Sequence, residues 1–279
     1  MNNHQINELE LFINANMLDS ELISIQKYSK RLQKHRTLLK KRPRKIKVAL
    51  MSMFTNDFLK EILDIFLFQK GIDAEIYIPK YGTMFADLLD KNSGFYKFNS
   101  DCTILWPTYR DLDFFNTTMK KELAFWEKIW KSIPGEIIQM SYDFPPYSPF
   151  GETKNSREGK ILDRTKKINA KLRNFAHSKV IVIDTERLAA RIGYKNWHDS
   201  RIYTLTKQPF SMDSLPEIAH AISSHIVSLY GMGKKALVLD LDNTLWGGEI
   251  GDLGIKGISI GKETPNGEGF KEFQNYVKE

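Results

Sequence analysis

Short apolar runs alternate with longer amphipathic stretches through most of the chain. Six such runs are found, at residues 47–54, 74–78, 102–107, 136–140, 179–184 and 235–240. Continuous apolar runs of this length are typical of strands that are covered on both faces. Strands that alternate with helices predict a parallel α/β sheet.

The stretches between the runs predict helices. The clearest covers residues 57–70, with Asn56 placed to cap it and Gly71 just past its end. Further amphipathic stretches lie at residues 115–130, 159–175 and 216–230. Phe125, Trp126 and Trp130 have helical spacing and are expected in the core. The segment 142–154, rich in proline and aromatic residues, follows a strand end and is expected on the side where α/β proteins bind ligands, although an ordinary surface loop is the alternative.

The first 45 residues predict a helical N-terminal arm that runs into a basic linker, and Pro43 ends the helix. Residues 27–47 hold eleven basic and no acidic side chains, whereas the rest of the chain has 30 basic and 34 acidic ones. The formal charge of +7 is therefore a property of one segment. We interpret this segment as a solvated helix and linker. Binding to nucleic acid or anionic lipid is the weaker alternative, because no aromatic interleaving accompanies the charge.

Composition excludes several classes of protein. The chain has 279 residues, of which 42% are hydrophobic and 27% charged, as in an average globular protein. No apolar run approaches the roughly 20 residues of a membrane helix, and the acidic N-terminus is unlike a signal peptide. The one cysteine, Cys102, allows no intramolecular disulfide and is expected to be a buried core residue. We expect a cytoplasmic protein that binds neither membrane nor nucleic acid.

The pattern D-x-D-x-T follows the last apolar run, at Asp240, Asp242 and Thr244. Two carboxylates that are two residues apart at a strand end can face one opening. The first can attack phosphorus, and the second can protonate the leaving oxygen. Mg²⁺ would relieve the repulsion between the two acids and neutralise phosphate charge. An acidic turn without catalysis is the alternative.

These residues resemble motif I of the haloacid dehalogenase (HAD) superfamily. The longer string at residues 240–261, with Leu245, Trp246, Gly247 and Gly248, resembles the FkbH-like subfamily. That resemblance implies a doubly wound α/β domain similar to SGNH hydrolases and flavodoxins at residues 46–230. It also implies the first strand, flap and helix of a Rossmann-like HAD domain at residues 234–279, with the helix at 264–278.

The resemblance also implies a reaction. Asp240 would be the nucleophile and a Mg²⁺ ligand, and Asp242 would be the acid/base and a second ligand through its backbone carbonyl. We assign substrate binding to Asn243, Thr244, Gly247 and Gly248. The family's reaction would remove phosphate from a phosphorylated glycerate and load the glyceryl group on an acyl carrier protein thiol. A small-molecule phosphatase, or a non-catalytic SGNH-like binding module, is the alternative.

Only 39 residues follow Asp240, which leaves no room for the later Ser/Thr, Lys and acidic motifs of a HAD domain. We therefore expect a truncated chain that lacks phosphoryl transfer by itself.

The upstream region also departs from a working SGNH hydrolase. Ser52 follows the first predicted strand and could be the nucleophilic serine, and His198 could be the histidine, but no Asp-x-x-His is present. The adjacent Asp199 is poorly placed to pair with His198. We interpret Ser52 and His198 as a vestigial site, with purely structural roles as the alternative.

Overall fold

The computed structural model describes residues 3–39, 43–115, 118–145, 156–176, 179–233, 235–262 and 264–278. The chain divides into two compact units, residues 1–231 and 232–279, and each has its own structure.

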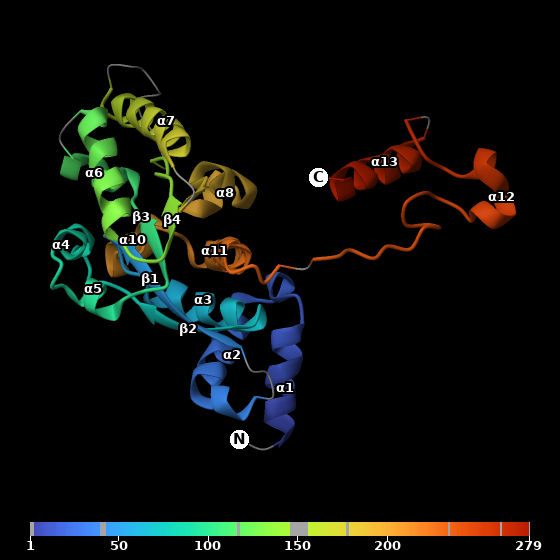
Figure 1. Cartoon of the computed structure of the whole chain (residues 1–279), viewed down its shortest axis with the longest axis horizontal. Coiled ribbons are helices and arrows are strands. Elements are labelled where there is room, and N and C mark those ends of the chain that lie inside the picture. Colours follow the sequence, from blue (N-terminus) through green and yellow to red (C-terminus); the bar gives the residue numbers. More distant parts are fainter. Residues whose placement is uncertain are drawn as a thin grey trace. The chain divides into compact units, whose positions relative to one another are not determined.

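A five-stranded parallel sheet forms the centre of the first unit (Figure 1). Its strands are β1 (Arg44–Ser52), β2 (Ile72–Tyr77), β3 (Cys102–Trp106), β4 (Glu136–Met140) and β5 (Val180–Ile183). The spatial order is β2-β1-β3-β4-β5, and all four neighbouring pairs are parallel. The chain therefore reverses its direction of progress across the sheet after β2, which places a switch point between β1 and β3. The first five predicted strands and the α/β fold class are confirmed.

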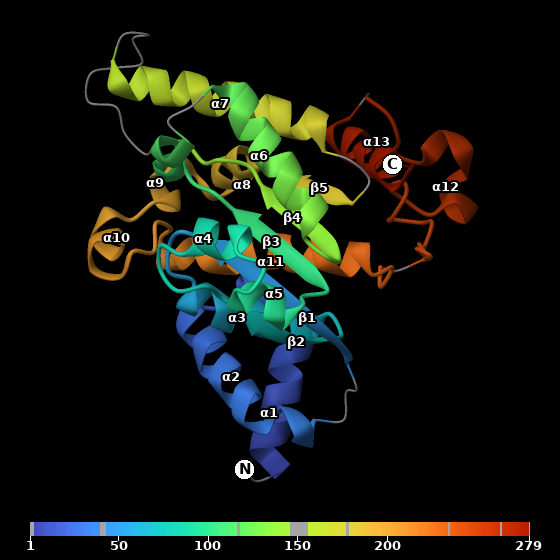
Figure 2. The same ribbon diagram turned by 60° about the vertical axis from the view of Figure 1, so that its left-hand side comes forward.

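Helices connect the strands and cover both faces of the sheet (Figure 2). In chain order, the α-helices of the first unit are α1 (Asn3–Asn14), α2 (Leu22–His35), α3 (Asp57–Gln69), α4 (Met84–Leu89), α5 (Gly94–Phe98), α6 (Met119–Ser132), α7 (Arg157–Phe175), α8 (Thr185–Ile192), α9 (Tyr194–Trp197), α10 (Ser200–Thr206) and α11 (Leu215–Leu229). The short 3₁₀ helices are η1 (Met17–Asp19), η2 (Arg36–Leu38), η3 (Tyr109–Phe115) and η4 (Met212–Ser214). No described helix is both long and apolar enough to span a membrane.

The core follows from the alternation of side chains along β1. Ala49 and Met51 join a buried cluster with Trp126 and Trp130 of α6. Val48 and Leu50 are also fully buried, and because strand side chains alternate, they face the other side. Apolar side chains on both faces explain why this strand reads as a continuous apolar run. Phe125 is partly buried against the same cluster.

Cys102 is fully buried at the start of β3, as expected. Burial raises the pKa of its thiol to about 12. The thiolate, which is the reactive form, is therefore disfavoured at neutral pH.

The N-terminal arm packs on α3 through both α1 and α2. Leu9, Ile25 and Leu32 are fully buried on these two helices. Arg36, just after α2, pairs with Asp64 and Asp73. The arm is thus part of the first compact unit, and one of its basic side chains is neutralised by acids of that unit.

The predicted cap of α3 is wrong in one respect. Asn56 occupies the N-cap position, but its side chain does not accept from the helix. Its amide instead donates to the Ser52 hydroxyl at 2.5 Å. Gly71 lies just past the helix end with φ of 88°, the left-handed conformation that favours glycine.

In the second unit, the predicted strand at 235–240 is not formed. A strand needs a hydrogen-bonded neighbour, and the described part of this unit provides none for these residues. Val238 is 93% exposed, so the run also lacks a core to pack on. The helix predicted at 264–278 is present as α13 (Pro265–Lys278), and α12 (Ile250–Gly257) precedes it.

Candidate functional site

The two acids of the D-x-D-x-T motif lie in a turn of the second unit. Asp240 is exposed, and its Oδ1 accepts from the backbone N–H of Leu241 at 2.8 Å. Asp242 is partly buried, and its Oδ1 accepts from the Trp246 indole at 2.9 Å and from the Ile250 backbone N–H at 3.2 Å. Asp242 is therefore oriented by the turn that follows it, whereas Asp240 faces water.

The glycine-bearing turn folds back on the motif. Asn243 adopts φ of 55°, and its side-chain oxygen accepts from the Gly248 backbone N–H at 2.8 Å. Gly248 itself has φ of 95°. Gly247 exchanges two backbone hydrogen bonds with Ser259, at 2.9 and 2.8 Å. These contacts give Asn243 and the glycines a structural role in the turn.

An open hollow lies beside this turn, and two of the predicted substrate-binding residues line it. Its described lining is Asn243, Thr244, Pro265, Asn266, Gly269, Phe270 and Phe273. Asp240 and Asp242 are not among these residues. The described residues do not bring the two acids and the predicted substrate-binding side chains into one enclosed pocket.

The donor set at the motif is compatible with Mg²⁺ but small. Mg²⁺ is commonly held by one or two carboxylates together with water and phosphate oxygens. Asp240 and Asp242 could supply the carboxylates. Across the described residues, no group of three or more His, Cys, Asp or Glu side chains is placed to hold a metal ion. The motif thus fits part of a Mg²⁺ site.

Ser52 ends β1 at the carboxyl edge of the sheet, opposite Trp106 at the end of β3. It is fully buried. Its hydroxyl donates to the Phe54 carbonyl at 2.8 Å and accepts from the Asn56 amide at 2.5 Å. Phe54 packs edge-on against Trp106. Both hydrogen-bonding roles of the hydroxyl are therefore used inside the protein.

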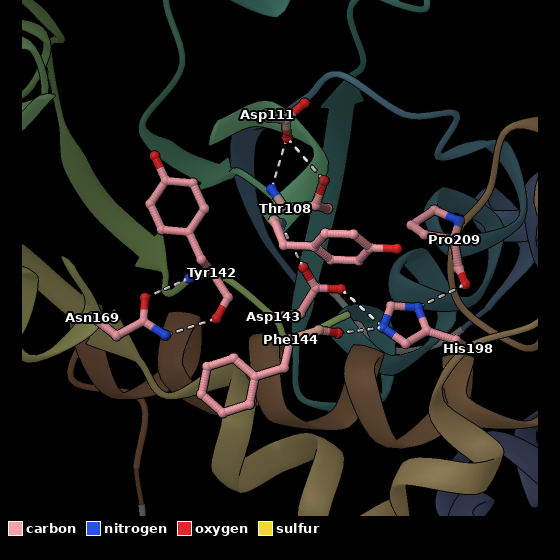
Figure 3. A network of polar contacts seen from close by, with 9 residues as sticks. Thr108, Asp111, Tyr142, Asp143, Phe144, Asn169, His198 and Pro209 are labelled. Atoms are coloured by element: carbon pink, nitrogen blue, oxygen red, sulfur yellow. Dashed lines mark hydrogen bonds and ion pairs between the residues drawn. The ribbon is translucent and has the colours of Figure 1, made fainter. Parts of the chain in front are cut away.

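His198 lies at the same edge of the sheet, but its polar contacts are with Asp143, Phe144 and Pro209 (Figure 3). Its Nε2 is 3.0 Å from the carbonyl oxygen of Phe144 and 3.3 Å from Oδ2 of Asp143. Its Nδ1 is 3.3 Å from the carbonyl oxygen of Pro209. The contact with Asp143 is at ion-pair distance without hydrogen-bond geometry. Ser52 is not among the hydrogen-bond partners of His198.

The His198 ring is surrounded by oxygen atoms. Carbonyl and carboxylate oxygens only accept hydrogen bonds, and acceptors face both ring nitrogens of His198. Asp143 is fully buried beside the ring. Its other oxygen accepts from the Tyr109 backbone N–H at 2.9 Å.

A second buried acid lies close by, at Asp111. Its Oδ2 accepts from the Thr108 backbone N–H at 2.7 Å and from the Thr108 hydroxyl at 3.0 Å (Figure 3). Burial raises the pKa of Asp111 to about 6, although the two bonds from Thr108 oppose the shift. Burial also raises the pKa of Asp143, against the attraction of His198.

The loop after β4 is anchored by Asn169 of α7. The Asn169 side chain accepts from the backbone N–H of Tyr142 at 2.9 Å and donates to its carbonyl at 2.8 Å. The next residue is Asp143. The described part of the 142–154 segment, residues 142–145, therefore forms the polar network, while the rest of that segment lies outside the described residues.

The sequence gives no direct indication of Asp143 as the partner of His198. The two are separated by 55 positions and meet only when the ends of two chain segments come together at one sheet edge. The available signal is positional, since Asp143 closely follows a predicted strand. Asp199 does not pair with His198. It caps α10 by accepting from the backbone N–H groups of Arg201 and Ile202.

Comparisons with known proteins agree with this architecture. A family model described as FkbH, N-terminal domain, matches residues 47–227. No curated protein matches the chain.

Among solved structures, one match is the N-terminal part of the protein BF1531 from Bacteroides fragilis. Its crystal structure is described as containing a phosphatase domain complexed with Mg. It is 26% identical, with a TM-score of 0.77, over 91% of this chain and 69% of that one. A lipase/acylhydrolase from Enterococcus faecalis matches at 14% identity and a TM-score of 0.47, over 70% of this chain and all of that one.

Proposed function

Because this chain belongs to the FkbH N-terminal domain family, we propose that the intact protein is a Mg²⁺-dependent phosphoryl transferase in which Asp240 accepts the phosphoryl group. The observation that supports the proposal most is the asymmetry of the two acids. Asp240 is exposed, as a nucleophile must be, whereas Asp242 is fixed through one oxygen by Trp246 and Ile250. The similar Bacteroides fragilis protein, with its phosphatase domain and Mg, adds support.

Each acid has a distinct role in the proposed reaction. The Asp240 carboxylate attacks phosphorus and forms an aspartyl-phosphate. Asp242 gives a proton to the leaving oxygen and then takes one from the next nucleophile. The bonds from Trp246 and Ile250 orient the Asp242 carboxylate. When bound, Mg²⁺ would neutralise phosphate charge beside Asp240 and Asp242. We expect residues 1–279 alone to show no turnover, because their described side chains supply only part of the metal site.

The test is phosphate release from 3-phosphoglycerate by the full-length protein. We expect release to require Mg²⁺ and to stop when EDTA removes it. Asp240→Asn should lower kcat at least 10³-fold, and Asp242→Asn by about 10²–10⁴-fold. Asp252→Asn is the matched control, since Asp252 is an exposed acid of the same unit in the first turn of α12. Full activity in Asp240→Asn would refute the proposal.

We propose that an acyl carrier protein docks on α2 and that its thiol attacks the carbonyl carbon of glycerate activated as an acyl phosphate, so that the C–S bond forms as phosphate leaves. Lys27, Lys30 and Lys34 are exposed and follow one another at spacings of three and four, so they share a helix face. Carrier proteins of this kind are acidic, so this basic face suits them. If water instead takes the phosphoryl group from Asp240 and no glyceryl group is transferred, the protein is a simple phosphatase.

Charge reversal tests the docking face. The double change Lys30→Glu and Lys34→Glu should weaken binding of the carrier protein at least tenfold at low salt. Lys171→Glu is the control, because this exposed lysine lies on α7. Unchanged binding in the double variant would remove α2 as the docking face. Glycerate released without any carrier-linked product would favour the phosphatase.

A second candidate function concerns the first unit alone, as a binding module without hydrolase chemistry. Its specific support is that the Ser52 hydroxyl is committed to Phe54 and Asn56, and both His198 nitrogens face oxygens of other residues. A fluorophosphonate probe should therefore leave Ser52 unlabelled. Labelling of Ser52 would restore the esterase interpretation.

A further inference from the structure

An arginine without a counter-ion lies at the carboxyl edge of the sheet. Arg110 is in η3, just after β3, and is half-buried. Within the described residues, it makes no ion pair, and its Nη1 is a buried donor without a hydrogen-bond partner. Buried donors are nearly always paired in native proteins, so such a nitrogen needs an explanation. One explanation is a ligand atom.

The guanidinium is held in place by two tyrosine rings. Its central carbon is 4.4 Å from the ring centre of Tyr109 and 4.2 Å from that of Tyr203 in α10. Such cation–π contacts restrict the movement of the guanidinium, while its N–H donors remain in the guanidinium plane. The two rings therefore position a planar set of donors.

Nearby acids do not use these donors. Arg110 is close enough to Asp143 and Asp111 to lower the pKa of each, but it pairs with neither. Asp143 lies 3.3 Å from the His198 ring, and Asp111 is bonded to Thr108. Arg110 therefore has two acids nearby, but none of the described residues accepts a hydrogen bond from its Nη1.

The position is one where α/β proteins bind ligands. η3 follows β3, which is next to the switch point between β1 and β3, at the carboxyl ends of the strands. Asp143 and His198 lie at the same edge, and Trp197 beside His198 has a second buried N–H without a partner. The described residues at this edge therefore include two buried N–H donors without a partner, beside one such acceptor, Oδ2 of Asp143.

We propose that Arg110 binds an oxyanion, a carboxylate or phosphate group of a small organic ligand, at the carboxyl edge of the first unit. The planar donors of arginine match the two oxygens of such a group. Tyr109 and Tyr203 position the guanidinium. The residues that form this site all belong to the first unit, and the site gives the binding module a ligand class.

The test is binding of inorganic phosphate and, separately, of D-glycerate to the 279-residue chain without metal, measured by calorimetry. We expect at least one anion to bind saturably and Arg110→Gln to weaken it at least tenfold. Arg110→Lys, which keeps the charge but loses the planar donors, should also weaken binding. Arg201→Gln is the control, because Arg201 is an exposed arginine of α10, the helix that carries Tyr203.

Saturable binding of phosphate alone would identify the ligand group as a phosphoryl group, and saturable binding of glycerate alone would identify it as a carboxylate. Either result supports the proposal. It is overturned if neither anion saturates, or if Arg110→Gln binds like the wild type. Thermal unfolding checks that Arg110→Gln is folded. If it is not, Tyr203→Leu replaces it, because this change keeps Arg110 but removes one ring and should weaken binding about threefold.

Discussion

In the first unit, Asp143 and Asp111 are almost fully buried, and donors from Tyr109, Thr108 and His198 surround them. In the second unit, Asp240 is exposed and bonds only the backbone of its neighbour among the contacts that the structure describes. Acids of the first kind are enclosed by the fold, and one oxygen of each already accepts a hydrogen bond from it. An acid of the second kind is available to react. The comparison indicates that the reactive acid of this chain is Asp240, which belongs to a motif that the fold leaves exposed to solvent.

The largest stability effect is expected at the buried pair of Asp143 and His198. Asp143→Ala leaves the buried His198 ring without the carboxylate 3.3 Å away and the Tyr109 backbone N–H without its acceptor, and loss of one member of a buried pair costs about 3–5 kcal/mol. Asp199→Ala, which only removes the α10 cap, should cost about 1 kcal/mol. Urea unfolding measures both. If the two variants lose the same stability, Asp143 is no more important than a surface cap.

A smaller effect is expected from Asp111, and it depends on pH. Its folded pKa of about 6 lies above the ordinary 3.8, so the folded protein binds this proton more tightly than the unfolded chain. The contribution of Asp111 to stability is then complete below about pH 4 and is lost as the pH rises through 6. Asp111→Asn cannot ionise, and should therefore be more stable than the wild type by roughly 2–3 kcal/mol at pH 7.5.

This difference should shrink towards zero at pH 4, where the wild-type carboxyl is also neutral. Urea unfolding of both proteins at several pH values is the measurement. A difference that does not change with pH would contradict the raised pKa of Asp111.

A smaller effect than that of Asp111 is expected at Ser52. Ser52→Ala removes the bond to the Phe54 carbonyl and leaves the Asn56 amide donor buried without that acceptor. The cost should be about 1–2 kcal/mol in the free energy of unfolding. Hydrolysis of p-nitrophenyl acetate should be the same in the wild type and the variant. A loss of esterase activity in Ser52→Ala at unchanged stability would instead show that Ser52 is a catalytic residue of the first unit.

The sheet could be predicted from the sequence because burial on both faces leaves a one-dimensional signal. β1 and β3 are continuous apolar runs, and each is covered on both sides. The run at 235–240 has the same composition, yet it forms no strand. The composition of a segment indicates its tendency to form a strand. A strand also requires a neighbouring strand to bond with, and a local sequence pattern cannot show whether one is present.

The candidate sites divide in the same way. Asp240 and Asp242 are visible in sequence because their spacing is local. The pairing of Asp143 with His198 joins two distant segments, and the other contacts of the His198 ring are with the carbonyl oxygens of Phe144 and Pro209. Backbone oxygens carry no side-chain signature. Arg110 was missed because its distinguishing property is the lack of a partner, which only the fold reveals.

The most direct test of the account is to trap the phosphorylated enzyme. The full-length protein, mixed with Mg²⁺ and 3-phosphoglycerate, would be quenched in acid within milliseconds and mapped by peptide mass spectrometry. The account predicts a phosphate on the peptide that contains Asp240, absent in Asp240→Asn and retained in Asp252→Asn and Ser52→Ala. Phosphate on another residue, or turnover in Asp240→Asn equal to that of the wild type, would contradict it.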